Sequence, residues 1–295
     1  MNVLVTGGSG FIGSVLVKSL VRRGHNVSTL DRSPTKHGVD VNQHQGDIRN
    51  FEDVESAVRG QDLVYHLAGL LGTHELVGDA GRALEVNVGG TLNVLDTCRI
   101  HGARILLVSK PNVWLNTYSI TKEAAEQFSK MYMEEHGVIT TIVKWFNVYG
   151  PGQGVGRGHV QKAVPTFIVN ALKQGPLPVF GDGTQTGDFI YVDDTVEATV
   201  EVADSEAARG RTVEIGSGCE TSVLEMCNMI LQMTESSSKV EFQPMRRGET
   251  ANTSLRADLR VLEQTTDFVP QMKMEHGLKK TIEYYRQMLV SETHD

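Results

Sequence analysis

The chain has 295 residues, of which 40% are hydrophobic, and its 28 Lys and Arg against 36 Asp and Glu give a net charge of −8. This length allows one full hydrophobic core or somewhat more, and the acidic balance argues against nucleic acid as a main partner. No signal segment and no apolar run of about 18 residues occurs, so we expect no secretion, no membrane partner and a cytoplasmic location.

The first predicted elements are a strand that ends at Thr6, a glycine-rich turn and a helix from Phe11 to Arg23. In such a strand–turn–helix unit the free N–H groups of the first helical turn face a pyrophosphate. One glycine makes the turn, the second admits the phosphates, and the third allows the helix to pack closely on the strand. The expected cofactor contacts here are Gly7, Gly10, Phe11, Ile12 and Gly13.

Asp31 ends the second predicted strand, about 20 positions after the glycines. A carboxylate at this place accepts hydrogen bonds from the adenosine ribose and repels a 2′-phosphate, which favours NAD over NADP. The adjacent Arg32 is a complication, because its guanidinium could pair with such a phosphate. We predict NAD as the cofactor.

The alternation of strands and helices continues through the first half of the chain. It predicts a short strand at 39–45, a helix at 51–58, a strand at 62–66, a helix at 80–101, a strand at 104–109, a helix at 118–136 and a strand at 140–145. Strands separated by helices of this length pair in parallel through right-handed crossovers. The predicted fold class is therefore α/β, a doubly wound parallel sheet of the Rossmann type.

The regular alternation of strands and helices ends after residue 150. The sequence predicts a helix from about residue 160 to 173, short extended segments at 178–180 and 188–191, and a last amphipathic helix at 274–289. Ser222 and Glu225 form a capping box that opens a further helix. We expect a cofactor-binding domain at 1–150 and a smaller carboxy-terminal α/β substrate lobe at 151–295, with some exchange of chain between them.

Tyr118 and Lys122 are four residues apart, so on a helix they share a face, where an ammonium group can stabilise a phenolate. An unperturbed tyrosine has a pKa of about 10, and lowering it to about 7 requires roughly 4 kcal/mol of preferential phenolate stabilisation. The pair therefore predicts a general base. Cys98, Cys219 and Cys227 have apolar neighbours and no metal-ligand spacing, so we expect buried structural thiols and no metal.

These features together resemble the extended short-chain dehydrogenase/reductase family of nucleotide-sugar epimerases, dehydratases and decarboxylases, over nearly the whole chain. Further motifs that carry the resemblance are Gly46-Asp47-Ile48, His66-Leu67-Ala68-Gly69, Asn87-Val88-Gly89-Gly90-Thr91, Phe146-Asn147-Val148-Tyr149-Gly150-Pro151, Gly181-Asp182-Gly183-Thr184-Gln185, the run 188–194 and Arg246-Arg247-Gly248-Glu249. The family has Rossmann architecture and uses a Tyr-Lys pair to oxidise a sugar hydroxyl transiently.

The resemblance implies additional site residues. Those expected to contact the cofactor are Asp47, Ile48, Leu67, Ala68, Gly69, Asn87, Tyr118 and Lys122. For the substrate, Asn147 and Arg246 are expected at the diphosphate and Phe180 at the nucleotide base. Asn87 could instead anchor the middle of the substrate site or the junction between helix and sheet.

The segment before Tyr118 departs from the family pattern, because the loop is shorter than usual and Ser109 precedes the tyrosine by only nine positions. Lys110 stands at the place of the family's Ser or Thr, and Pro111 and Asn112 stand where dehydratases have an Asp-Glu acid/base pair. Neither of these two residues exchanges a proton usefully. Removal of water needs an acid and a base, whereas 4-epimerisation needs only the tyrosine and the cofactor, so the sequence favours an epimerase.

The role of Lys110 stays open between a hydrogen bond to the substrate oxygen, stabilisation of an ionised Tyr118, and an ordinary solvated loop lysine. Ser109 or Thr117 could replace the missing hydroxyl. The diphosphate site also departs from the pattern, because Gly187 replaces a common Arg and Lys144 a frequent one, which leaves fewer charges for phosphate.

Three hypotheses of function follow. The first is an NAD-dependent 4-epimerase that acts on a UDP-hexose or UDP-N-acetylhexosamine. The second is a dehydratase or decarboxylase with an acid from elsewhere, such as Glu75, and the third is a catalytically idle NAD-binding sensor. The resemblance also implies a homodimer in which the helices 80–101 and 118–136 form a four-helix interface, with Leu92, Leu95 and Phe128 as candidate contacts.

Overall fold

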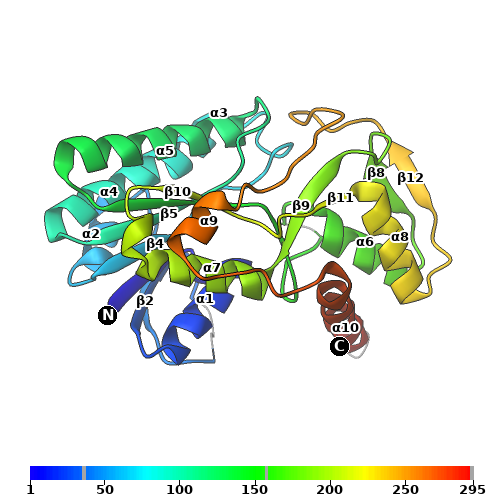
Figure 1. Cartoon of the computed structure of the whole chain (residues 1–295), viewed down its shortest axis with the longest axis horizontal. Coiled ribbons are helices and arrows are strands. Elements are labelled where there is room, and N and C mark those ends of the chain that lie inside the picture. Colours follow the sequence, from blue (N-terminus) through cyan, green and yellow to red (C-terminus); the bar gives the residue numbers. More distant parts are fainter. Residues whose placement is uncertain (35–37, 157–158, 293–295) are drawn as a thin grey trace.

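The computed structural model describes residues 1–34, 38–156 and 159–292, in a larger and a smaller part that lie side by side (Figure 1). The strands of the larger sheet are β1 (Asn2–Thr6), β2 (Asn26–Asp31), β3 (Asn42–Gln45), β4 (Leu63–His66), β5 (Arg104–Ser109), β6 (Thr140–Trp145) and β10 (Thr212–Ile215). All of them pair in parallel, in the order β10-β6-β5-β4-β1-β2-β3. The predicted doubly wound α/β fold is confirmed.

Helices cover both faces of this sheet because its central strands are apolar on both sides. In β1, Val3 and Val5 belong to one core cluster, whereas Leu4 belongs to another on the opposite face. The helices on the first face are α1 (Phe11–Arg22) and α7 (Val192–Asp204), and those on the second are α2 (Phe51–Val58), α4 (Gly90–His101) and α5 (Thr117–His136) (Figure 1). The sheet is thereby buried between two helical layers.

The helix expected at 80–101 is interrupted. It consists of α3 (Ala80–Leu84), a π-helical turn (Glu85–Gly89) and α4. Asn87 lies in this turn and directs its side chain to the loop after β4 and to α5. The expectation of one continuous helix is therefore wrong. Distant contacts stabilise this single wide turn, so the hydrophobic periodicity of the sequence does not reveal it.

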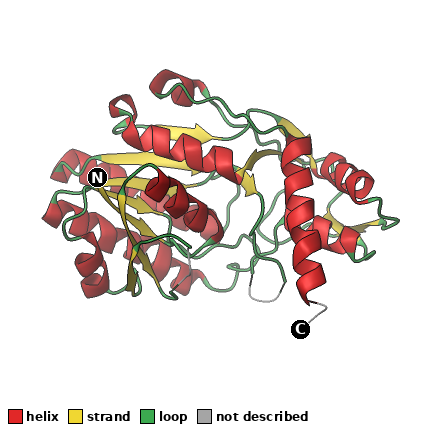
Figure 2. Cartoon of the chain, turned by 90° about the horizontal axis from the view of Figure 1, so that it is seen from below, coloured by secondary structure: helices red, strands yellow, loops and turns green. Residues whose placement is uncertain are grey.

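Among the described residues, the smaller part contains two short sheets and three helices. The strands are β7 (Asn147–Tyr149), β9 (Thr186–Tyr191) and β11 (Glu220–Ser222) in one sheet, and β8 (Leu177–Phe180) and β12 (Val240–Gln243) in the other. The helices are α6 (Ala163–Leu172), α8 (Val223–Thr234) and α10 (Met274–Glu292). Figure 2 shows the long α10 running beside this part to the C-terminus. No helix of the described residues is long and apolar enough to cross a membrane.

Two further local predictions are tested by the structure. The capping box is confirmed, because Ser222 Oγ accepts the N–H of Glu225 at 3.1 Å and the Glu225 carboxylate accepts the N–H of Ser222 at 2.7 Å. The expectation of three buried thiols is wrong for Cys219, which lies exposed just before β11, whereas Cys98 and Cys227 are buried. In the part of the chain that the structure describes, no group of three His, Cys, Asp or Glu side chains could hold a metal ion.

The chain passes between the two parts more than once. After β9, the helix α7 returns to the larger part and packs against α1, and β10 then pairs in parallel with β6. The short helix α9 (Arg260–Thr265) packs on β10. Segments from beyond residue 150 therefore complete the large sheet, and the carboxyl ends of its strands face the smaller part.

Candidate active site

The glycine-rich turn between β1 and α1 fits a dinucleotide pyrophosphate. Gly7 has φ +74° and donates its N–H to Leu30 O at 3.0 Å, and a Cβ there would lie 2.9 Å from Ala68 N. A Cβ at Gly13 would collide with the Gly7 carbonyl, so helix and strand pack as closely as the spacing predicts. No side chain caps α1, which starts after Gly10, so its first N–H groups are available to an anion.

Asp31 lies beside this turn at the end of β2. Its carboxylate accepts the backbone N–H of Ser9 at 3.1 Å, which ties the acidic side chain to the glycine loop. Arg32 is exposed, and its carbonyl accepts a hydrogen bond from the Gln45 side chain at 3.1 Å. The position of Asp31 is the one from which a carboxylate reaches a ribose, and its role stays a prediction.

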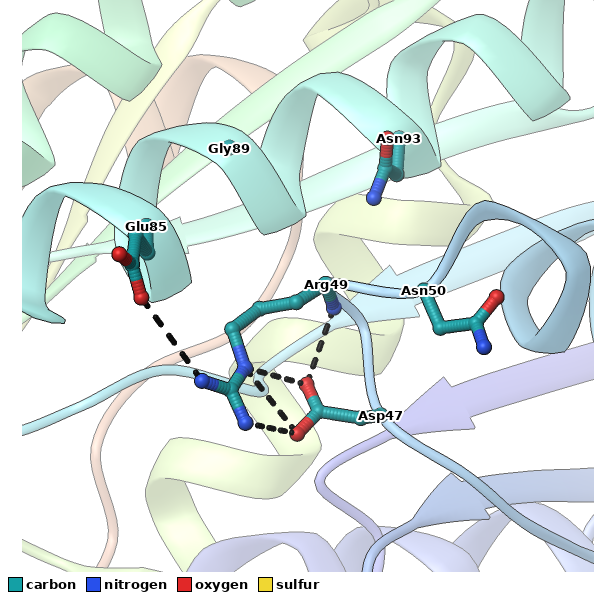
Figure 3. Close-up of a pocket in the computed structure, with 6 residues that line it drawn as sticks. All are labelled: Asp47, Arg49, Asn50, Glu85, Gly89 and Asn93. Atoms are coloured by element: carbon teal, nitrogen blue, oxygen red, sulfur yellow. Dashed lines mark hydrogen bonds and ion pairs between the residues drawn. The ribbon is translucent and has the colours of Figure 1, made fainter.

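A hollow of about 700 Å³ opens next to Asp47 and is lined by Asp47, Arg49, Asn50, Glu85, Gly89 and Asn93 (Figure 3). The Arg49 guanidinium donates to the Asp47 carboxylate at 2.7 Å and lies 3.8 Å from Glu85. The hydrogen bond from Arg49 lowers the pKa of Asp47. Ile48 is buried, and its carbonyl accepts the amide of Asn93 at 2.9 Å. The sequence motif identified Asp47 and Ile48 but not the arginine that holds the carboxylate.

Asn87 joins the loop after β4 to α5. Its Oδ1 accepts the N–H of Leu70 at 2.7 Å, and its Nδ2 donates to Leu70 O at 3.0 Å and to Thr121 Oγ1 at 3.1 Å. Both amide hydrogens of this buried residue are thus engaged by protein, and its contact with cofactor or substrate stays a prediction. The segment from Leu67 to Gly69, expected to contact the cofactor, directly precedes the anchored Leu70 and faces the glycine turn at Ala68.

Tyr118 and Lys122 lie one turn apart on α5, as their spacing predicts. The Lys122 ammonium donates to Val108 O at 2.5 Å, and burial lowers its pKa to about 8. Burial also raises the pKa of Tyr118 to about 12, because removal from water disfavours the phenolate. The stabilisation of the phenolate by the Lys122 ammonium together with the positive charge of the nicotinamide stays a prediction.

Lys110 is not an ordinary solvated loop lysine. Its Nζ donates to Ser119 Oγ at 2.8 Å and lies 5.4 Å from the centroid of the Tyr118 ring. Burial first, and then the charge of Lys162, lower its pKa to about 8. The loop thus places an ammonium group against the face of the tyrosine that the spacing identified.

Ser109 is bound by a carboxylate on α5. The buried hydroxyl donates to Glu126 Oε1, and the amide of Asn112 donates to the same oxygen at 2.8 Å. The other carboxylate oxygen lies 3.1 Å from the Lys144 ammonium. The catalytic role of Ser109 stays a prediction, and its hydroxyl would have to leave Glu126 to donate to a substrate. Sequence reasoning missed Glu126, although its position one turn after Lys122 places it on the same face of α5.

The expected diphosphate residues lie on the smaller part. Asn147 donates its amide to Asp188 O at 3.2 Å, and a Cβ at Gly187 would lie 2.7 Å from Asn147 Nδ2. A side chain at position 187 would therefore crowd the Asn147 amide. Arg246 lies with its guanidinium 4.8 Å from the Phe180 ring centroid and 2.6 Å from the Glu249 carboxylate. The Phe180 ring and the Arg246 guanidinium thus lie against each other.

Glu75, the alternative acid, bridges two segments at the edge of the site. Its carboxylate accepts the N–H of Gln161 at 3.2 Å, and the Gln161 carbonyl accepts a hydrogen bond from Arg246 at 3.4 Å. Since Glu75 is exposed and engaged by a backbone N–H, it joins the loop after β4 to the segment that precedes α6. No motif in the sequence predicts this contact between Glu75 and Gln161.

Known proteins match nearly the whole length of the chain. The model of the NAD dependent epimerase/dehydratase family matches residues 3–216. UDP-N-acetyl-alpha-D-glucosaminuronate decarboxylase of Bacillus cytotoxicus is 31% identical, with 97% of this chain and 98% of that protein covered. The UDP-glucose 4-epimerase of Thermotoga maritima is 25% identical with a TM-score of 0.91, over 98% of this chain and 100% of that one. The UDP-glucuronic acid 4-epimerase of Bacillus cereus, solved with UDP-glucuronic acid and NAD, is 26% identical with a TM-score of 0.89 over the same shares.

Proposed function

Since this chain belongs to the NAD dependent epimerase/dehydratase family, we propose that it is a UDP-sugar 4-epimerase that works by transient oxidation at C4. Its cofactor is NAD, and it is a nucleotide-sugar-modifying enzyme. The observation that carries the proposal is the contact of Lys110 with Ser119 and the Tyr118 ring. It puts a proton acceptor and a hydrogen-bond donor together where a sugar hydroxyl can meet both.

The chain's own residues divide the work as follows. Tyr118 removes the proton of the 4-hydroxyl while hydride leaves C4, and it returns the proton in the reverse step. Lys110 donates a hydrogen bond to the same oxygen and is oriented by Ser119. Lys122 adds positive charge on the same face of α5, which favours the phenolate. NAD, when bound, supplies the acceptor and later the donor of the hydride.

Dehydration is disfavoured by the residues at 111 and 112. Pro111 has no titratable group, and Asn112 is an amide that donates to Glu126. Loss of water from a 4-keto sugar needs an acid and a base at adjacent carbons, whereas inversion at C4 requires that the intermediate turn and accept hydride on its other face. The pair of residues that this family's dehydratases would use is therefore replaced by groups without useful proton exchange.

Decarboxylation is the second candidate, because the Bacillus cytotoxicus relative matches almost the full length of both chains. A 4-keto group makes a C6 carboxylate a β-keto acid, so the C5–C6 bond can break and release carbon dioxide. This reaction uses the same oxidation at C4 and does not need the Asp-Glu pair. Epimerisation and decarboxylation thus share Tyr118 and differ in the step that follows.

The test is incubation of the NAD-loaded protein with UDP-glucose, UDP-galactose, UDP-N-acetylglucosamine and UDP-glucuronate, followed by NMR of the products. The expected result is C4 inversion, with one set of C4 epimers reached from either side. Release of carbon dioxide and a UDP-pentose from UDP-glucuronate would transfer the assignment to the decarboxylase. Inertness toward the whole panel, with NAD bound, would support the sensor.

A further inference from the structure

Tyr118, Lys122 and Glu126 follow one another at steps of four residues along α5, so their side chains form one row on this helix. The end of β5 lies along this row. The Lys122 ammonium donates to Val108 O at 2.5 Å, and the Ser109 hydroxyl donates to the Glu126 carboxylate. Glu126 is 3% exposed, so the row ends in a buried carboxylate that is tied to the strand.

This carboxylate holds the segment 109–112 at both ends. Its Oε1 accepts the hydroxyl of Ser109, the first residue of the segment, and the amide of Asn112, the last one, at 2.8 Å. Its Oε2 lies 3.1 Å from the ammonium of Lys144 on β6, the strand that pairs with β5. Lys110 lies between the two tied residues, so Glu126 restrains the backbone that carries this lysine.

An ion pair in such a buried place is more than packing requires. Removal of a carboxylate and an ammonium from water is costly, and a buried ion pair is often no more stabilising than apolar side chains of the same volume. A fully bonded polar network instead favours one geometry over its alternatives. We propose that Glu126 is a positioning residue: its carboxylate fixes the segment 109–112, so that the Lys110 ammonium stays against the Tyr118 ring. The inference rests on the proposed oxidation at C4 and names a residue outside the reacting groups that maintains their geometry.

The charge of Glu126 acts on the same two lysines. It raises the pKa of Lys110 and that of Lys122, both of which burial lowers to about 8. The other titratable groups that act on these lysines or are acted on by them are Lys144 of β6, Lys162 before α6 and His66 of β4. Loss of the carboxylate lowers the pKa of Lys110 and of Lys122, so both ammonium groups lose their protons at a lower pH.

The experiment uses NAD-loaded Glu126→Gln, which keeps the size of the side chain and removes its charge. With the nucleotide sugar that the wild type converts, kcat should fall about tenfold or more while KM changes by less than about threefold, because the reacting groups lose their alignment and the binding contacts stay. The alkaline fall of kcat should move to lower pH by about half a unit or more. Amide hydrogen exchange should become faster in 109–116 and stay unchanged in β1 and α1.

Glu134→Gln is the matched control, because Glu134 is exposed further along the same helix, and it should leave kcat, the pH profile and the exchange unchanged. The double variant Glu126→Gln/Lys144→Met tests whether Glu126 serves only to neutralise Lys144. We expect the loss of kcat and the faster exchange to persist in it, and recovery of both would overturn the inference. The double variant also provides the test where Glu126→Gln alone does not fold, since it leaves no buried ammonium at position 144.

Melting temperature and NAD content show that each variant is folded. Faster exchange throughout the protein would make Glu126 a residue of general stability and would also overturn the inference. If the wild type oxidises its sugar at C4 and Glu126→Gln matches it in kcat, pH profile and exchange, the positioning role fails while the proposed function stands. If exchange rises only in 109–116 but the wild type converts no nucleotide sugar, the positioning role stands and the proposed function fails.

Discussion

The ammonium group of Lys110 lies 5.4 Å from the centroid of the Tyr118 ring and donates a hydrogen bond to Ser119, the next residue along α5. A short loop after β5 thus brings a cation to the face of the residue that we propose as the base. Because burial alone raises the pKa of this tyrosine to about 12, nearby positive charge is what can bring the phenol toward ionisation at neutral pH.

Replacement of Tyr118 by phenylalanine removes the proposed base but keeps the aromatic ring. Turnover of the sugar substrate should fall by at least about 10²-fold, the range of general-base catalysis. NAD content and melting temperature should stay close to those of the wild type. Activity within a factor of about three of the wild type would remove Tyr118 from the reaction.

Turnover of the sugar substrate should depend on pH through Lys110, whose pKa is lowered to about 8. Burial and the charges of Lys162, Lys122 and Lys144 lower this pKa, and Glu126 raises it. The ammonium form donates the hydrogen bond to the substrate oxygen, so kcat/KM should be high below pH 8 and fall as the pH rises through 8. Lys122 also has a pKa of about 8, so the comparison with Lys110→Gln separates the contribution of Lys110 from that of Lys122. The fall should be smaller in Lys110→Gln than in the wild type, and an unchanged profile in that variant would contradict this origin.

Gly13→Ala tests the packing of the cofactor turn. A Cβ there meets the Gly7 carbonyl and lies 2.9 Å from Gly8 Cα, both of which are backbone atoms that cannot move aside. We expect a loss of about 1–3 kcal/mol in unfolding free energy and a protein that purifies without NAD. Gly24→Ala, where a Cβ would meet nothing within 4 Å, is a control for the cofactor, because φ +81° strains the backbone but leaves the turn open. Full NAD content in Gly13→Ala would show that the contact is not required.

Asp31 should determine the preference for NAD. Its carboxylate is fixed by the N–H of Ser9, at a place where it would repel a 2′-phosphate. The wild type should bind NAD at least about tenfold more tightly than NADP, and Asp31→Ala should reduce this ratio to about one. Fluorescence titration of both cofactors gives the ratio, and a tenfold preference for NADP in the wild type would make Arg32 a phosphate ligand.

Dimerisation remains a prediction that the described residues refine. Leu95 is fully buried in the core between α2 and α4, so it is not an interface contact, whereas Phe128 is exposed on α5 and Leu92 is partly exposed. Other exposed apolar side chains on these helices are Leu84, Ile100, Ile120 and Met131. Sedimentation of the wild type at micromolar concentration should give a dimer, and Phe128→Glu should shift it to a monomer with its fold intact. A monomeric wild type would refute the interface.

The sequence by itself determined the features that a few neighbouring residues encode. The bounds predicted for α2, β5 and β6 agree with the structure, because apolar periodicity and strong capping residues act within one or two turns. The glycine spacing and the four-residue step from Tyr118 to Lys122 likewise follow from local geometry. The family and the NAD cofactor were therefore accessible from motifs, whereas the division into domains and the roles of single residues stay proposals.

Only the tertiary structure decided what these side chains face. Ser109 and Lys110 are adjacent in the chain, yet one hydroxyl binds Glu126 and the other side chain reaches Tyr118. Arg246 meets Phe180 from a segment more than sixty residues away. Burial and the charges of such distant groups set the pKa values and the availability of each donor, and no local pattern records them. The physical reason is that hydrogen bonding and desolvation depend on which segments the fold brings together.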